Sequence, residues 1–233
     1  SKKNFNIYFK YLLTFIAIVP ACLLLMMQPD IGQTLLIFLV WAILVFISGI
    51  SLPVILTFFC FALLSLIYMV FFISKFAYIK NRILSFFNPT DGTHNFQSDK
   101  AIDAISSGGY FGKGIGEGTL KNRVPEAHTD YIISVISEEF GVVAIMLLLI
   151  LFLFFIYTVF TKINLEKSEK IKLVLTGSMC LIIFQALIHI GVNIRLFPTT
   201  GMTLPFLSYG GSSIVGVSIL SGIILNLTKR KIN

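Results

Sequence analysis

The chain has too few charged residues to cover the surface of a water-soluble domain. Asp, Glu, Lys and Arg make up only 12% of its 233 residues, whereas hydrophobic residues make up 56% and include 23 phenylalanines. A soluble domain normally carries about a quarter charged residues. The composition therefore excludes a soluble globular domain and favours a protein that exposes apolar side chains to lipid.

The sequence also lacks the alternation of apolar and polar residues that is typical of membrane β-barrel strands. Six runs are apolar throughout and have roughly the 20-residue length with which an α-helix crosses the hydrocarbon core. We predict an all-α integral membrane protein, a single membrane domain over residues 1–233 with about six transmembrane helices. The predicted spans are residues 11–27, 34–50, 53–72, 140–160, 171–190 and 206–227.

Cysteine is scarce as well. Cys22, Cys60 and Cys180 all fall inside apolar runs, so their spacing offers neither a disulfide framework nor a pair of metal ligands. His128 has no second ligand at metal spacing. We predict no metal site from these residues and interpret the cysteines as small apolar core residues.

Lysine and arginine are distributed unevenly among the predicted connections. The N-terminal segment, the loop between the fourth and fifth spans and the C-terminal tail carry 10 of them, whereas the two short connections on the opposite side carry Arg195 alone. Short loops rich in Lys and Arg stay in the cytoplasm, so both termini of this chain are predicted to be cytoplasmic. The net charge of +7 reflects this orientation, and no basic stripe with interleaved aromatics indicates nucleic-acid binding.

One long polar connection, residues 73–139, includes the start of the fourth helix and is predicted to be extracytoplasmic. A structureless connection of this length is uncommon in a compact protein unless it is functional, so we place the chemistry there. Within it, residues 106–118 are dense in glycine. Their backbone N–H groups form a phosphate cradle or, in the alternative interpretation, the segment is a flexible turn, because the spacing of a P-loop is missing.

A polar stripe is predicted where the next helix begins. Residues Asp130, Ser134, Ser137 and Glu138 recur at helical spacing on a helix that would extend to Phe160, about 46 Å at 1.5 Å per residue. Such a stripe faces protein or water and not lipid, so it predicts a polar cavity headed by Asp130. The alternative is that Asp130 only caps the helix.

Three further polar features lie near the predicted spans. Asp30, in the turn at residues 28–32, either caps the next helix or faces an internal cavity. His189, within the fifth span, is expected to hydrogen-bond a neighbouring helix. The loop at residues 197–205 and the small residues at 208–213 are either a packing motif or irregular backbone beside a wet cavity.

Six blocks of the sequence together resemble the SEDS family of bacterial membrane proteins, which includes FtsW, RodA and SpoVE. In family order they are QPDIG (28–32), RILSFFNP (82–89), GGYFGKGIG (108–116), PEAHTD (125–130), EEFG (138–141) and GMTLPFLSYGGSS (201–213). Thr203 makes the last block more similar to FtsW than to RodA, which usually has proline there. The resemblance identifies the chain with the C-terminal six helices of a roughly ten-helix fold.

The resemblance implies a glycosyltransferase that polymerises lipid II into peptidoglycan at the outer face of the cytoplasmic membrane during division. The family's proposed catalytic aspartate corresponds to Asp130, which as a general base would take the proton of the acceptor sugar hydroxyl. The leaving group is a lipid-linked pyrophosphate, which requires cations or N–H donors. Candidate substrate-binding residues are Arg82, Lys113, Lys121, Arg123, His128, Glu138, Arg195, Ser208 and Tyr209.

One departure from the family concerns this positive charge. Thr200 stands where FtsW proteins usually have lysine, and our hypothesis is that Arg195, five positions earlier, supplies the charge instead. A divalent cation is an alternative source of this positive charge, although the sequence contains no recognisable cofactor motif or set of metal ligands. The expected partners are lipid II, membrane lipids, a class B penicillin-binding protein and other divisome membrane proteins, and no nucleic acid.

Two other functions fit parts of the sequence. A lipid II flippase would also need intramembrane charges and broken helices, but the carboxylates cluster at the outer face and no inverted repeat is visible, which favours surface chemistry. An inactive or scaffolding fragment is the third interpretation, because the resemblance covers only the later helices of the family.

Overall fold

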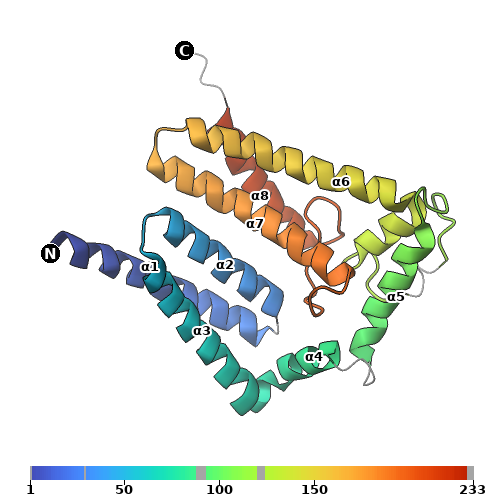
Figure 1. Cartoon of the computed structure of the whole chain (residues 1–233), viewed down its shortest axis with the longest axis horizontal. Helices are drawn as coiled ribbons and strands as arrows, with labels where there is room; N and C mark the ends of the chain where they lie inside the picture. The colour runs from blue at the N-terminus through green and yellow to red at the C-terminus, as the bar shows by residue number, and fades with distance from the viewer. Residues whose placement is uncertain (1, 29, 88–92, 120–123, 230–233) are drawn as a thin grey trace. The chain divides into compact units, whose positions relative to one another are not determined.

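The structure of the chain is a computed structural model that describes residues 2–28, 30–87, 93–119 and 124–229. Within these ranges it contains helices and no β-strand, which confirms the predicted all-α class (Figure 1). In chain order the elements are α1 (Lys2–Met27), α2 (Ile31–Ile47), α3 (Leu52–Phe72), the short 3₁₀ helix η1 (Ser74–Phe76), α4 (Ala77–Phe87), α5 (Thr93–Gly108), α6 (Ile132–Leu165), α7 (Glu169–Asn193) and α8 (Gly211–Thr228).

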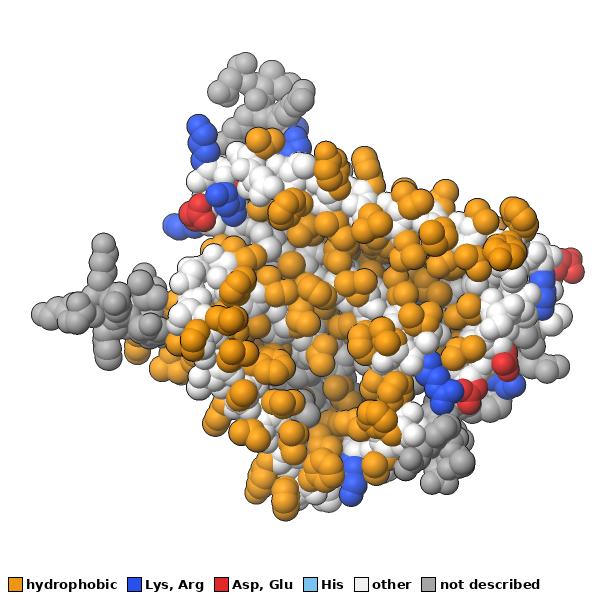
Figure 2. All heavy atoms as spheres, in the orientation of Figure 1, with side chains coloured by type: hydrophobic (Ala, Val, Ile, Leu, Met, Phe, Trp, Pro, Cys, Tyr) orange, Lys and Arg blue, Asp and Glu red, His pale blue; other side chains and the backbone are white. Residues whose placement is uncertain are grey.

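Four helices are long and apolar enough to cross a bilayer, namely α3, α6, α7 and α8, and two shorter apolar helical stretches occupy Tyr11–Met27 and Ile31–Ile47. Their exposed side chains are apolar, for example Leu147, Leu151 and Phe154 on α6. Figure 2 shows hydrophobic side chains over most of the face in view, with charged side chains near its margins. The chain is therefore a multi-pass membrane protein, and the count of six spans stays a prediction.

The chain divides into two compact units, Ser1–Asn81 and Arg82–Asn233. In the first unit α1 packs on α2 around Trp41, whose indole ring lies 5.3 Å from the ring of Phe15. The backbone N–H of Gln33 donates to the Asp30 carboxylate at 2.9 Å, so Asp30 caps α2. Of the two interpretations of Asp30, the structure shows the helix cap.

In the second unit α6 and α7 lie alongside each other, α8 packs against α7, and α5 packs on the first turns of α6 (Figure 1). Val159 and Ile163 of α6 meet Leu175 and Ile182 of α7 and Ile224 of α8 in one buried apolar cluster. Because α7 lies between two neighbours, many of its side chains are buried, including polar ones. This helix supplies one wall of the site described below.

The helix predicted to run unbroken from Asp130 to Phe160 is instead interrupted at Gly141, which has φ 75° and ψ −176°. Backbone groups released by this kink are bonded to residues 109–116, here called the glycine loop. The N–H groups of Lys113 and Gly114 donate to the carbonyls of Glu138 and Glu139 at 2.9 and 3.0 Å. In return, backbone N–H groups of α6 donate to Gly109 and Tyr110. The kink therefore leaves these groups satisfied within the protein, as membrane helices require.

Three glycines, Gly108, Gly112 and Gly141, allow this contact because a side chain at any of them would collide with backbone. A β-carbon at Gly108 would lie 1.9 Å from the Ser137 carbonyl oxygen, and one at Gly112 would lie 2.1 Å from that of Glu139. Neither interpretation of the glycine-dense segment anticipated this role. The loop is packed on α6, and the N–H groups of Lys113 and Gly114 are used in that packing.

Candidate functional site

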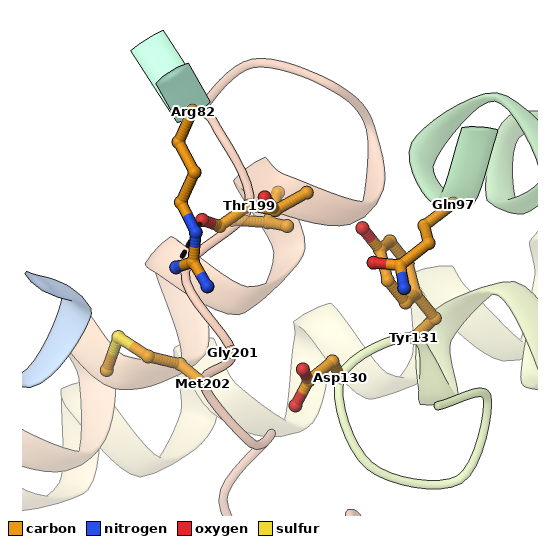
Figure 3. A pocket seen from close by; sticks show the side chains of 8 residues that line it. Arg82, Gln97, Asp130, Tyr131, Thr199, Gly201 and Met202 are labelled. Carbon is orange, nitrogen blue, oxygen red and sulfur yellow. Dashed lines mark hydrogen bonds between the residues drawn. The ribbon is translucent and has the colours of Figure 1, made fainter. Parts of the chain in front are cut away.

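A small pocket of about 180 Å³ lies within the second unit, beside the turn that precedes α6. Its lining comes from α4, α5, the turn before α6, the end of α7 and the loop that follows α7 (Figure 3). The lining residues are Arg82, Gln97, Asp130, Tyr131, Val192, Thr199, Gly201 and Met202. We call this the Asp130 pocket.

Asp130 lies in a tight turn that ends where α6 begins. The carbonyl of Glu126 accepts the N–H groups of Thr129, Asp130 and Tyr131 at 3.1, 3.0 and 3.3 Å. The N-cap of α6 is Tyr131, with no capping bond from its side chain, so Asp130 is not the helix cap. The turn instead presents the Asp130 carboxylate to the pocket.

Two other segments hold this turn in place. Asn193, at the end of α7, donates from Nδ2 to the Asp130 carbonyl at 2.9 Å. The Ser208 hydroxyl donates to the Thr129 carbonyl at 2.7 Å, and the Tyr209 N–H donates to the His128 carbonyl at 3.0 Å. The structure therefore brings Ser208, Tyr209 and His128 next to Asp130, where they hold the turn through its backbone.

A row of polar side chains on α7 supports the opposite wall of the pocket. Gln185, His189 and Asn193 follow one another at four-residue spacing and are all buried. Gln185 Nε2 donates to the Thr203 carbonyl at 3.0 Å, and His189 Nδ1 lies 2.7 Å from the Met202 carbonyl oxygen. His189 was expected to hydrogen-bond a neighbouring helix. Its partner is instead the backbone of the loop at residues 199–203.

Gly201 brings this loop close to the carboxylate. Its φ is 72°, in the left-handed region, and a β-carbon there would lie 3.6 Å from Asp130 Oδ2. The loop is thus part of the irregular backbone that lines a polar pocket, which was one of the two interpretations of residues 197–205.

Replacing Asn193 by alanine is expected to lower the rate of the glycosyltransferase reaction predicted from the sequence about tenfold or more, because a small displacement of the predicted base Asp130 is costly. The substitution removes the amide that holds the Asp130 carbonyl. The measurement is the turnover rate of the full-length protein beside its thermal stability. Ser178→Ala, a buried polar change on the same helix, is the control. An unchanged rate in Asn193→Ala would contradict a positioning role.

Arg82 brings positive charge to the pocket and is held there by the loop, since its Nη1 donates to the Thr199 carbonyl at 3.3 Å. Its charge reaches Tyr131: burial raises the pKa of the Tyr131 hydroxyl, the Asp130 carboxylate raises it further, and Arg82 lowers it. The pocket therefore combines a carboxylate, a guanidinium and a phenol that keeps its proton at neutral pH.

Several predicted site residues lie elsewhere in the second unit. Lys113 pairs with the buried Glu138 at 3.5 Å where the glycine loop meets α6. Arg195 pairs with Asp99 of α5 at 2.5 Å, and it does not line the Asp130 pocket. The hypothesis that Arg195 supplies the charge for the substrate stays a prediction, and Arg82 is the basic residue among those that line the Asp130 pocket. Lys121 and Arg123 lie outside the described residues.

The predicted polar stripe does not line one cavity. Ser137 donates to the Ile105 carbonyl of α5 at 3.3 Å, and Ser134 donates to the Tyr131 carbonyl at 2.7 Å. Both serines are buried. Only Asp130, ahead of the helix, reaches the pocket. Along the described ranges, no three His, Cys, Asp or Glu side chains come together that could hold a metal ion.

Four polar or backbone contributors to the pocket were not predicted from the sequence: Gln97, Tyr131, Thr199 and Gly201. Gly201 belongs to one of the sequence blocks quoted above, and Tyr131 directly follows another. Their positions in or next to these motifs could have identified them as candidates. Gln97 is one polar residue among many in α5, and nothing in the local sequence marks it.

Comparison with known proteins gives consistent results. The family model of FtsW, RodA and SpoVE, described as cell cycle protein, matches residues 2–233. The probable peptidoglycan glycosyltransferase FtsW of Caulobacter vibrioides is 37% identical over 222 residues, 95% of this chain and 55% of that protein. The protein of the same name from Enterococcus hirae is 36% identical over 162 residues, 68% of this chain and 41% of its own. The chain thus spans about half the length of the curated relatives it matches.

The solved structures that resemble the fold include the following two. A chain from a study of how a peptidoglycan synthase complex coordinates polymerization and crosslinking superposes with a TM-score of 0.72 at 28% identity, covering 94% of this chain and 60% of that one. A mutant of the rod shape determining protein RodA of Thermus thermophilus gives 0.60 at 27% identity, covering 94% and 56%.

Proposed function

Because the chain belongs to the FtsW, RodA and SpoVE family of cell cycle proteins, we propose that it polymerises lipid II into glycan strands at the outer face of the bacterial cytoplasmic membrane during cell division. The resemblance predicted from the six sequence blocks is confirmed by that membership. The observation that carries the proposed reaction is that Asp130 and Arg82 both line one pocket. The proposed orientation has both ends of this chain in the cytoplasm.

The proposed chemistry uses Asp130 as a general base. Its carboxylate takes the proton from a hydroxyl of the acceptor sugar, and that oxygen attacks the anomeric carbon of the donor sugar. The bond from this carbon to the pyrophosphate oxygen breaks, and its electron pair leaves with the lipid-linked pyrophosphate. The proton on Asp130 then passes to water.

Arg82 suits the leaving group. Charge accumulates on the pyrophosphate as the bond breaks, and a guanidinium donates to phosphate oxygens with two parallel N–H groups. In Figure 3 the Arg82 guanidinium and the Asp130 carboxylate extend into the pocket from separate segments. Displacement at the anomeric carbon needs the base and the cation at separate positions, because the entering and leaving oxygens lie on opposite sides of that carbon.

The size of the pocket limits what it holds. Its volume of about 180 Å³ is below the roughly 300–1,000 Å³ of a pocket for a drug-sized ligand. A lipid-linked disaccharide is larger than that. We therefore propose that the pocket takes only the reacting groups and the sugar substituents next to them, while the lipid stays in the bilayer that the exposed apolar side chains contact.

Replacing Arg82 by alanine should lower the polymerisation rate about 10- to 100-fold, the value of a hydrogen bond to a charged group. Lysine at this position keeps the positive charge but cannot donate two parallel hydrogen bonds as the planar guanidinium does. Arg82→Lys should therefore retain more of the polymerisation rate than Arg82→Ala. Lys172→Ala removes a cation paired with Glu169 and serves as the control. An Arg82→Ala protein that polymerises at the control's rate would contradict the role of this residue.

Polymerisation and transport are separated by one experiment. The full-length protein is placed in vesicles with fluorescent lipid II, and glycan strands and the transbilayer distribution of the lipid are measured together. Strands formed from lipid II support the proposal. Movement of the lipid without strands would instead support a flippase.

We further propose that the protein works with a class B penicillin-binding protein and other divisome membrane proteins. The support is its likeness to a chain from a peptidoglycan synthase complex in which polymerization and crosslinking are coordinated. The product of the proposed reaction is the substrate that a crosslinking transpeptidase needs, so a shared complex is chemically reasonable.

A further inference from the structure

The two sides of the Asp130 pocket differ in charge. In Figure 3 Arg82 extends from one side, whereas Gln97 of α5 and Tyr131 extend from the other, and Asp130 lies between them in the view. Arg82 is a cation, while the amide of Gln97 and the phenol of Tyr131 are neutral. The pocket thus has a side suited to an anion and a side suited to an uncharged polar group.

The Tyr131 hydroxyl makes no hydrogen bond to the described part of the protein, although it is buried. The residue is 2% exposed, its side chain lines the pocket, and its oxygen is one of four buried side-chain polar atoms among the described residues that have no partner. A buried hydroxyl without a partner is unfavourable, because it has lost its hydrogen bonds to water, so such groups are few and each calls for an explanation. The hydroxyl therefore has a hydrogen bond that no described group uses and that a ligand bound against it would satisfy.

The ionisation of Tyr131 defines what it can offer. Burial and the Asp130 carboxylate both raise its pKa, against the opposing effect of Arg82, so the phenol carries its proton at neutral pH. It can therefore donate one hydrogen bond. Gln97 adds a carbonyl that accepts and an amide that donates, within the same pocket.

We propose that Gln97 and Tyr131 form a subsite for the acetamido group of the acceptor amino sugar, an inference that rests on the proposed function. An acetamido group has one carbonyl acceptor and one N–H donor and carries no charge. The Tyr131 hydroxyl donates to that carbonyl, and the Gln97 side-chain oxygen accepts from that N–H. The sugar is thereby oriented with its reacting hydroxyl toward Asp130.

The chemistry of this side favours an acetamido group over a phosphate. A phosphate needs a neutralising cation, and the cation that lines the pocket among the described residues is Arg82, on the other side in Figure 3. Asp130 would also repel an anion placed beside Tyr131. An uncharged group that both accepts and donates avoids this repulsion and uses both side chains.

The test compares the affinity of the full-length protein for lipid II with its affinity for an analogue whose acceptor sugar has a hydroxyl in place of the acetamido group. A hydroxyl is chosen because a free amine would add a charge beside Asp130. The wild-type protein should bind lipid II about fivefold more tightly than the analogue, the equivalent of one neutral hydrogen bond. Tyr131→Phe and Gln97→Leu should each remove most of this preference.

The control is Tyr157→Phe, which removes the hydroxyl of an exposed tyrosine on α6 and should leave the preference intact. Equal affinity of the wild-type protein for both lipids overturns the inference, as does a preference that both pocket variants retain. Because binding is measured, failure of the proposed function is seen separately. A protein that keeps the preference but makes no glycan strands refutes the reaction and supports the subsite.

Discussion

Polymerisation of lipid II should fall about 10²- to 10⁴-fold when Asp130 is replaced by asparagine in the full-length protein, the range of a lost general base. Asparagine has nearly the same shape and preserves the packing against Gly201, but it does not accept the proton of the sugar hydroxyl. The turn is held through the carbonyls of Thr129 and Asp130, which the substitution leaves in place. The rate should therefore fall without loss of folding.

The measurement is the initial rate of glycan strand formation by Asp130→Asn, with lipid II affinity and thermal stability determined on the same preparations. Asp103→Asn is the matched control, because Asp103 is exposed on α5 and pairs with Lys100. Affinity near the wild-type value with a lost rate would identify Asp130 as a catalytic group. Polymerisation at the rate of the control would show that another residue is the base.

Alanine or valine at Gly112 should prevent stable folding of the second unit. A β-carbon there would lie 2.1 Å from the Glu139 carbonyl oxygen, and the φ of 78° is itself unfavourable for any other residue. Backbone strain and overpacking together are expected to cost about 2–6 kcal/mol. The thermal stability of the detergent-solubilised protein and its yield report the loss.

Gly109→Ala distinguishes the cost of backbone strain from the cost of a steric clash. Gly109 has φ 58°, but no atom lies within 4 Å of the β-carbon that alanine would add. Only the backbone cost of about 1–3 kcal/mol applies to this variant. Gly112→Ala should therefore be clearly less stable than Gly109→Ala. Equal stability of the two proteins would contradict the close packing of the glycine loop on α6.

Much of the helical fold could be predicted because lipid requires long apolar runs. The span predicted at residues 53–72 is α3, Leu52–Phe72, and that at 171–190 lies within α7, Glu169–Asn193. The last span was predicted to begin at residue 206, but α8 begins at Gly211. The Ser208 hydroxyl accepts the Leu204 N–H and donates to the Thr129 carbonyl, and these long-range bonds hold the apolar start of the run outside the helix.

The kink in α6 could not be predicted because its cause lies far along the chain. A glycine in an apolar run is compatible with a continuous helix, and residues 132–165 have that pattern. The interruption at Gly141 is compensated by bonds to Gly109, Tyr110, Lys113 and Gly114. The helices α4 and α5 within the predicted long connection were missed too, since polar segments of this kind lack the apolar signal of the spans.

Two of the residues that line the Asp130 pocket were named from the sequence. Asp130 and Arg82 were proposed from motif resemblance, and both line the pocket. Lys113 and Arg195 were proposed for their charge, but each has an acidic partner that only the fold reveals, and Arg195 pairs with a residue 96 positions away. Charge alone did not show which of these cations is paired with a carboxylate in the fold.

The central claim, that Asp130 and Arg82 act on one substrate within a single pocket, is tested most directly by a structure of the full-length protein with a lipid-linked disaccharide bound. We expect an acceptor sugar hydroxyl within about 2.6–3.2 Å of the Asp130 carboxylate, with the donor pyrophosphate next to Arg82. A substrate bound productively elsewhere, with its reacting hydroxyl out of reach of Asp130, would contradict it.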